Sequence, residues 1–181
     1  DFTHPESGMA VSVSSVRLER PLTGRAGINV QYEIRDADGK VVGKAWRQWH
    51  PSGPNGTPAR VDHMEIKLDQ SAQGNGFATA WNRHMEDVYR ANGIREIQLT
   101  ANEDVGGYAW AKQGYGFLDE EAVGDMADRL DRAIGDHPVG GDWSDADVRA
   151  MRALLKRMRS GDPEKAPTPL ELAMVGWTAG A

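Results

Sequence analysis

The chain has 181 residues, of which 39% are apolar and 27% charged, so it can bury a core and is not a disordered polypeptide. It contains no cysteine, which excludes disulfides, a thiol nucleophile and cysteine-ligated zinc. The net charge is −6, and residues 118–181 carry most of it with 13 acidic against 8 basic residues, so neither part has the basic excess typical of a nucleic-acid binder.

No apolar run approaches the roughly 20 residues that a membrane-spanning helix needs. We therefore expect no membrane partner and, in the absence of cysteine, a cytoplasmic location. The chain opens at Asp1 rather than Met, so removal of an earlier segment stays open. The acidic balance of 118–181 is typical of a solvated surface, although it could attract a basic partner.

The first part of the chain predicts strands. Residues 1–8 are polar and indicate a loop. Three segments with full or partial alternation of apolar residues follow, the pattern of half-buried strands, and they span 11–18, 28–34 and 61–68. Residues 41–49 are expected as the strand that returns from a hairpin. A turn cluster at 36–40 predicts a hairpin, and the proline-rich stretch 51–58 predicts a surface loop.

Helical patterns dominate the rest of the chain. Residues 77–91 carry an apolar stripe at spacings of four and three, made of Phe77, Trp81, Met85 and Val88. A short strand is expected at 94–100 and a short helix at 105–113. Capping boxes at 144–147 and 168–171 predict the starts of two further helices. This order indicates an α/β sheet protein with a helical C-terminal extension.

A glycine-containing turn joins the fourth predicted strand to the first helix. It consists of Gln73, Gly74, Asn75, Gly76, Phe77 and Ala78. The first turn of a helix leaves N–H groups unpaired, and glycine lets a ligand approach the backbone, so such a turn can bind phosphate. A plain strand-to-helix connection is the alternative. The chain lacks both the Gly-Lys-Ser/Thr of a P-loop and the Gly-x-Gly-x-x-Gly of a dinucleotide site.

The turn resembles the Gln/Arg-x-x-Gly-x-Gly/Ala pattern of GNAT-type N-acyltransferases, with Gln73, Gly76 and Ala78 in matching positions. The resemblance covers about residues 11–117. It implies a mixed, mostly antiparallel central sheet flanked by helices, in a domain of residues 1–117 followed by a helical extension of 118–181. It further implies acetyl-CoA as co-substrate, with no metal, and binding of the coenzyme A pyrophosphate by the amides of the turn.

The resemblance also implies two further contacts with coenzyme A. The exposed backbone at the end of the preceding strand would pair with the pantetheine arm, here at Ile66, Lys67 and Leu68. Asn102 corresponds to an asparagine that follows the next strand in the family.

The match breaks at the signature that follows. The family has Tyr-x-Lys-x-Gly-Phe, and this chain has Trp110 in place of the tyrosine that often protonates the leaving thiolate. An indole N–H donates but does not ionise usefully. Tyr108 is the nearest phenol and our candidate acid, although two residues on a helix are about 200° apart, so it cannot occupy the same place.

Glu65 is our candidate general base for an ammonium substrate. It alternates with Met64 and Ile66 and so points to the opposite face of its strand, and we expect His63 to share the face of Glu65. A histidine near neutral pH could serve as the base equally well. The alternative for both residues is an ordinary surface or hydrogen-bonded polar role.

Metal binding is not expected from the histidines. His50, His63 and His84 lie on different predicted elements without the short spacing of ligand pairs. Among the six tryptophans, most of which should be core residues, Trp46 and Trp110 could line an acceptor pocket.

The sequence therefore favours an acyl-CoA-dependent N-acyltransferase. In such an enzyme, the amine of a small molecule or peptide attacks the thioester directly and receives the acetyl group. One alternative is a catalytically altered GNAT-fold binding or scaffold domain of a larger protein, which Trp110 would suit. Another is a related transferase that takes its donor from aminoacyl-tRNA. The near-neutral balance of residues 1–117 argues against tRNA. A homodimer stays open, and the acceptor is not readable from the fold.

Overall fold

The computed structural model describes residues 1–19, 25–100, 110–136, 143–162 and 164–179. The chain forms two compact units, Asp1–Thr100 and Ala101–Ala181. The division lies before the domain boundary expected at residue 117, because Phe117 packs against the helical core of the second unit. The two units are described separately below.

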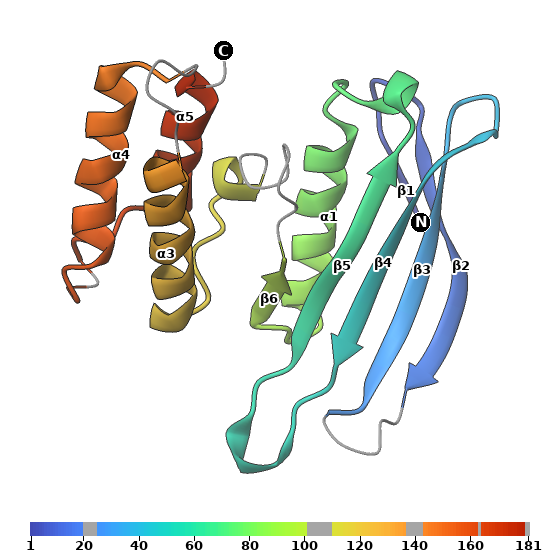
Figure 1. Cartoon of the computed structure of the whole chain (residues 1–181). Helices are drawn as coiled ribbons and strands as arrows, with labels where there is room; N and C mark the ends of the chain where they lie inside the picture. Colours follow the sequence, from blue (N-terminus) through green and yellow to red (C-terminus); the bar gives the residue numbers. More distant parts are fainter. Residues whose placement is uncertain (20–24, 101–109, 137–142, 163, 180–181) are drawn as a thin grey trace. The chain divides into compact units, whose positions relative to one another are not determined.

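The first unit is built on a six-stranded sheet in the order β1-β2-β3-β4-β5-β6. The strands are β1 (Phe2–Thr3), β2 (Ala10–Glu19), β3 (Gly27–Arg35), β4 (Val41–His50), β5 (Arg60–Leu68) and β6 (Glu96–Leu99). All neighbours are antiparallel except β5 and β6, which are parallel and joined through helix α1 (Phe77–Ala91) (Figure 1). The expected mixed, mostly antiparallel sheet with flanking helices is confirmed.

Helix α1 covers one face of this sheet with an apolar stripe. Its buried hydrophobic residues are Phe77, Trp81, Met85 and Tyr89, each at most 6% exposed. The stripe thus ends at Tyr89 rather than at the predicted Val88. The buried residues follow one another at intervals of four throughout, which places the large Tyr89 ring on the side facing the sheet. The ring of Tyr32 on β3 meets Trp81 edge-on at 5.5 Å, which joins sheet and helix into one core.

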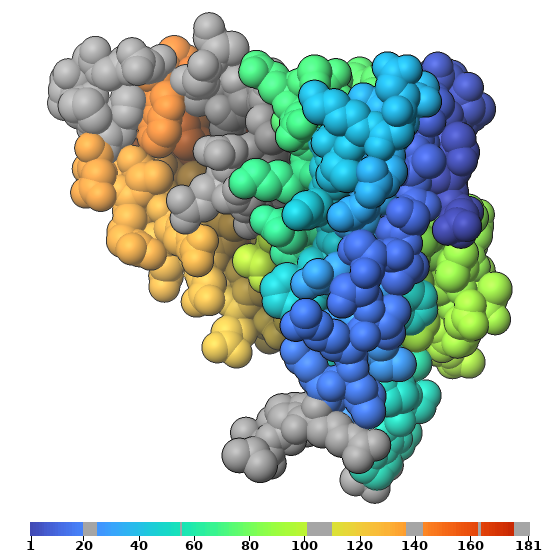
Figure 2. Space-filling view, turned by 90° about the vertical axis from the view of Figure 1, so that its right-hand side faces the viewer, coloured from blue at the N-terminus to red at the C-terminus, as the bar shows by residue number. Residues whose placement is uncertain are grey.

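Strand β1 was predicted as loop. It has only two residues, too few for a readable alternation, and it pairs with Val11 and Ala10 at one end of β2. The ring of Phe2 also lies 6.2 Å from that of Phe77, so packing on α1 holds the segment in place. Beyond β1 the outer strand β2 forms an edge of the sheet, which faces the viewer in Figure 2. Its apolar side chains Val13, Val16 and Leu18 are exposed.

The ladder between β4 and β5 contains a β-bulge. Trp46 pairs with Glu65 and Arg47 pairs with His63, so Met64 is an extra residue without an opposite partner. Paired residues share a face of the sheet. The bulge therefore reverses the alternation of β5 between His63 and Glu65, which decides where the candidate bases point.

The second unit contains three described helices, α3 (Glu120–Asp136), α4 (Asp145–Met158) and α5 (Pro169–Ala179). Both predicted capping boxes are confirmed. The Ser144 and Asp147 pair closes the start of α4, and the Thr168 and Glu171 pair precedes α5. A small core forms around Ala127, Leu155 and Met158. Within the described ranges no helix is long and apolar enough to cross a membrane.

Candidate functional site

The glycine turn adopts a backbone that glycine favours. Gly74 has φ of 78° and Gly76 has φ of 80°, both in the left-handed region, and α1 begins at Phe77 directly afterwards. A Cβ built on either glycine would meet no atom within 4 Å. The backbone of the turn therefore faces open space, as a ligand-binding turn requires.

Side chains of the turn and its neighbours fix this shape. The Asn75 side-chain oxygen accepts the Phe77 N–H at 3.1 Å, and its amide nitrogen donates to the Met9 sulfur at 3.2 Å. The Gln73 side-chain nitrogen donates to the Leu68 carbonyl at 2.9 Å. The last contact ties the turn to the end of β5.

Five N–H groups of the turn and first helical turn stay available. Within the described part of the chain, no hydrogen-bond acceptor is found for the amides of Gly74, Asn75, Gly76, Ala78 and Thr79. The Phe77 amide, which the sequence had placed among the donors, is instead occupied by Asn75. Thr79 was missed, although its place in the first turn of α1 was the available signal. Free amides at the start of a helix, together with the helix dipole, are an arrangement that can bind an anion.

Strand β5 presents a second set of backbone groups. Its parallel pairing with β6 ends where His63 meets Leu99, whereas β5 continues to Leu68. The Asp69 N–H donates to the Val42 carbonyl on the β4 side. Alternate residues of an antiparallel strand point their peptide groups to opposite edges. Ile66 and Leu68 therefore direct their N–H groups to the edge of β5 that has no paired strand beyond His63 in the described part of the chain. Lys67, by the same alternation, directs its peptide groups to β4.

Arg47 is fully buried beside the bulge. Its guanidinium donates to the Glu65 carbonyl at 2.8 Å and to the Trp46 carbonyl at 3.1 Å. The group lies 5.0 Å from the centre of the Trp81 ring, within cation–π range. Bonds from a charged donor to carbonyls offset part of the cost of burying the charge, which would otherwise be several kcal/mol.

His63 does not share the face of Glu65, so that prediction was wrong. The bulge at Met64 places His63 on the α1 side, where it is 4% exposed and its Nε2 lies 3.1 Å from the Tyr89 hydroxyl. Burial, and to a lesser degree the charge of Arg47, lowers the pKa of His63 to about 2. A buried imidazole with this pKa stays neutral and is a poor general base.

Glu65 lies exposed on the other face of the sheet, opposite Trp46 on β4. The Trp46 indole donates to the Asn29 side-chain oxygen at 3.2 Å, which orients the ring on the face that Glu65 shares. An exposed carboxylate next to an oriented indole can receive an ammonium ion by charge and by cation–π attraction. This face is distinct from the one that α1 covers.

The two remaining histidines of the metal hypothesis have other neighbours. His50 is 5% exposed, and its ring nitrogens face the Asp62 carboxylate at 3.0 Å and the Ala26 carbonyl at 3.3 Å. Arg60 binds the same carboxylate. The His84 ring lies against Phe2, 5.1 Å between centres. Among the described residues, no three His, Asp or Glu side chains lie close enough to hold a metal ion.

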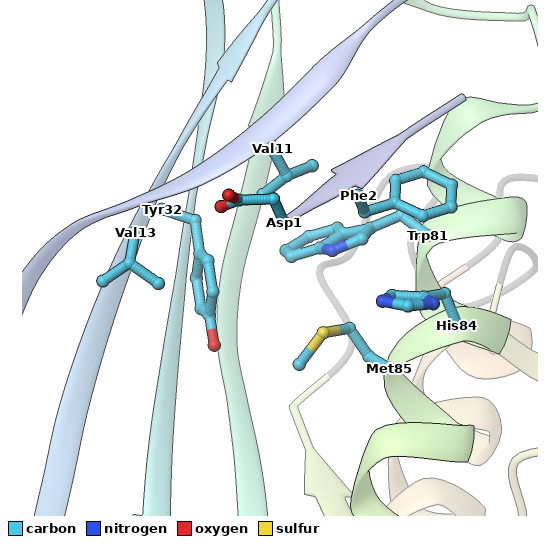
Figure 3. A pocket seen from close by; sticks show the side chains of 8 residues that line it. All are labelled: Asp1, Phe2, Val11, Val13, Tyr32, Trp81, His84 and Met85. Atoms are coloured by element: carbon cyan, nitrogen blue, oxygen red, sulfur yellow. The ribbon is translucent and has the colours of Figure 1, made fainter. Parts of the chain in front are cut away.

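A small cavity of about 50 Å³ lies between the sheet and α1 (Figure 3). Tyr32 and Val13 face it from the strands, and Trp81, His84 and Met85 face it from the helix. A cavity of this size holds water or a small group but no coenzyme. It is also on the α1 face, opposite to Glu65, so we do not assign it to the acyl donor.

The predicted site residues of the second unit are only partly described. Asn102 and Tyr108 lie outside the described residues. The ring of Trp110 meets that of Tyr115 edge-on, with 5.3 Å between centres. This contact gives Trp110 a packing partner in its own unit.

No protein-family model matches the chain, and a search of curated proteins finds no match. Several solved structures do match. An acetyltransferase from Trypanosoma brucei is 22% identical with a TM-score of 0.42, over 48% of this chain and 61% of that chain. A ribosomal-protein-alanine N-acetyltransferase from Brucella melitensis biovar Abortus is 20% identical with a TM-score of 0.42, over 50% and 66%. A transcriptional regulator from Bacillus halodurans is 15% identical with a TM-score of 0.44, over 50% and 61%.

This chain therefore spans less than two thirds of each of these structures. A likeness at these identities and TM-scores assigns no activity or substrate to this chain.

Proposed function

We propose that the chain is an acyl-CoA-dependent N-acyltransferase that transfers an acetyl group from acetyl-CoA to an amine. One observation supports the proposal most: a turn whose backbone N–H groups have no acceptor lies next to a strand edge whose N–H groups are also unpaired among the described residues. The five free amides from Gly74 to Thr79 suit a pyrophosphate. The open N–H groups of Ile66 and Leu68 on β5 suit the amide carbonyls of a pantetheine arm. The Gln73 bond to the Leu68 carbonyl keeps the two sets adjacent.

In this arrangement the thioester carbonyl would accept the Ile66 N–H, which stabilises the oxyanion of the tetrahedral intermediate. The amine would approach from the Glu65 face. Its nitrogen forms a bond to the acyl carbon, its proton passes to the Glu65 carboxylate directly or through water, and the carbon–sulfur bond breaks. A thiolate is a good enough leaving group to depart without a dedicated acid, which accommodates Trp110 in place of tyrosine.

The proposal is tested by calorimetry with acetyl-CoA and by thiol release with a broad panel of amines. We expect binding at micromolar concentrations and turnover of at least one amine. In the Glu65→Gln variant, acetyl-CoA should bind within about threefold of wild type while kcat falls by about 10²-fold or more, because a neutral amide cannot accept the proton.

Glu33→Gln is the matched control, since Glu33 lies on β3 and pairs with Arg35 at 2.6 Å, and its kcat should stay unchanged. No binding at high micromolar acetyl-CoA would contradict the proposal. Turnover by Glu65→Gln equal to wild type would remove Glu65 as the base.

A binding domain without catalysis is the second candidate, and Trp110 is the observation that favours it. The indole replaces the ionisable phenol of the family signature and is engaged with Tyr115. This candidate also predicts acetyl-CoA binding. It differs in predicting no thiol release with any amine of the panel, so the same assay separates the two.

A further inference from the structure

The position of Arg47 at the bulge suggests more than a packing role. The side chain is fully buried, and a single guanidinium nitrogen donates to carbonyls of both strands, Glu65 on β5 and Trp46 on β4. The Trp81 ring lies against the same group, and the Asn82 side-chain oxygen is 3.5 Å from its other terminal nitrogen. Arg47 thereby joins β4, β5 and α1 at the point where the ladder is interrupted.

The carbonyl that Arg47 binds on β5 belongs to the same peptide unit as the Ile66 N–H. In a trans peptide the C=O and N–H bonds point in opposite directions. Because the Glu65 carbonyl points to Arg47, the Ile66 N–H points to the other edge of β5, past the end of the pairing with β6. A cation bonded to a carbonyl polarises the amide and makes its N–H a stronger donor.

We infer that Arg47 is a positioning residue for acyl transfer, which fixes the bulge of β5 and strengthens the Ile66 N–H as donor to the thioester carbonyl. The inference rests on the proposed function, because it needs a thioester at this edge of β5. Arg47 acts only through the peptide between Glu65 and Ile66 and touches neither donor nor acceptor. A merely structural arginine would stabilise the sheet without changing the thioester.

The test is the infrared carbonyl stretch of acetyl-CoA, ¹³C-labelled at the thioester carbonyl and bound to the full chain. We expect the stretch at higher frequency in Arg47→Lys than in wild type. The lysine side chain is shorter, so its ammonium group polarises the peptide between Glu65 and Ile66 less, and the hydrogen bond from Ile66 to the thioester carbonyl weakens. The affinity for acetyl-CoA should change by no more than about threefold, since a neutral ground-state hydrogen bond contributes little net. Turnover should fall by about tenfold, since the oxyanion depends more on the same donor.

Val61→Ala is the matched control. Val61 is also fully buried, lies on β5, and its truncation destabilises the sheet without touching the bulge. We expect an unchanged carbonyl stretch in this variant. If Arg47→Lys does not fold, Arg47→Gln serves for the same measurement, because its neutral amide can still donate to the Glu65 carbonyl but supplies no charge.

Two results would overturn the inference on its own: an identical stretch in wild type and the Arg47 variant, or an equal shift in Val61→Ala. Both presuppose that wild type binds acetyl-CoA. Absence of any bound signal in wild type would instead contradict the proposed function, and the role of Arg47 in acyl transfer with it.

Discussion

At the scale of single residues, one extra residue decides the chemistry of β5. Alternation alone puts Glu65 and His63 on the same face, and the ladder puts them on opposite faces because Met64 has no partner on β4. His63 then enters the α1 core against Tyr89, while Glu65 stays exposed beside Trp46. A general base must reach solvent or substrate, so the bulge leaves Glu65 as the candidate.

His63 makes the stability of the protein depend on pH. Its pKa is about 2 in the folded protein and about 6.5 in the unfolded chain, so below pH 6.5 the unfolded chain gains a proton that the folded protein excludes. The contribution of His63 to stability is therefore fully present above pH 6.5 and is lost as the pH falls below it. We expect the free energy of unfolding to drop by about 2 kcal/mol between pH 7.5 and 5 through this residue alone.

Urea unfolding followed by tryptophan fluorescence at several pH values checks this prediction. His63→Gln should lose that part of the acid dependence, because glutamine does not titrate. His84→Gln, whose ring lies against Phe2 at the edge of the core, is the control and should keep the wild-type dependence. Equal acid dependence in wild type and His63→Gln would refute the assignment.

At the scale of elements, the proposed donor binding depends on the turn between β5 and α1. Gly76 has φ of 80° and open space where a Cβ would lie. Alanine there would strain the backbone by about 1 kcal/mol and would place a methyl group where a pyrophosphate must approach. We expect Gly76→Ala to lower the affinity for CoA at least about tenfold by calorimetry.

Gly39 provides a matched control in the hairpin between β3 and β4. It has φ of 81° and also no atom within 4 Å of a built Cβ, so Gly39→Ala carries the same backbone strain away from the turn. Both variants should lose similar stability, and only Gly76→Ala should lose CoA affinity. Equal affinity in the two variants would contradict a pyrophosphate site at the turn.

The helices and strands could be predicted where the pattern of apolar residues repeats over enough positions. Strands β2 to β5, helix α1 and both capping boxes follow from alternation, a four-residue stripe and short local motifs. Strand β1 could not be predicted, because two residues are too few to show an alternating pattern. Packing of Phe2 against Phe77, a contact distant in sequence, holds the strand in place.

The candidate site divides in the same way. The turn at Gln73 is local in sequence and could be predicted with its glycines. The bulge at Met64 could not, because it arises from the register between two strands. Arg47 was missed for a related reason: a charged residue on an alternating strand reads as solvent-facing, and only the structure shows it 0% exposed between two carbonyls.

At the scale of the whole molecule, the described residues of the proposed donor site all lie in the first unit. The turn, the β5 edge, Arg47 and Glu65 all lie within Asp1–Thr100, which has its own core around Trp81. The second unit has a separate small core and most of the acidic excess. We therefore expect donor binding to depend on the first unit, whereas the acceptor is not specified by its fold.

The most direct test of the proposed donor site is a titration of the full, ¹⁵N-labelled chain with CoA, followed through its amide resonances. We expect the largest shifts at the free donors of the turn and of β5. These are Gly74, Asn75, Gly76, Ala78, Thr79, Ile66 and Leu68. The resonance of the hairpin glycine Gly39 should not shift. Saturation with CoA that leaves the resonances of these seven amides unshifted, or no shifts at all, would contradict a donor site at the turn and β5.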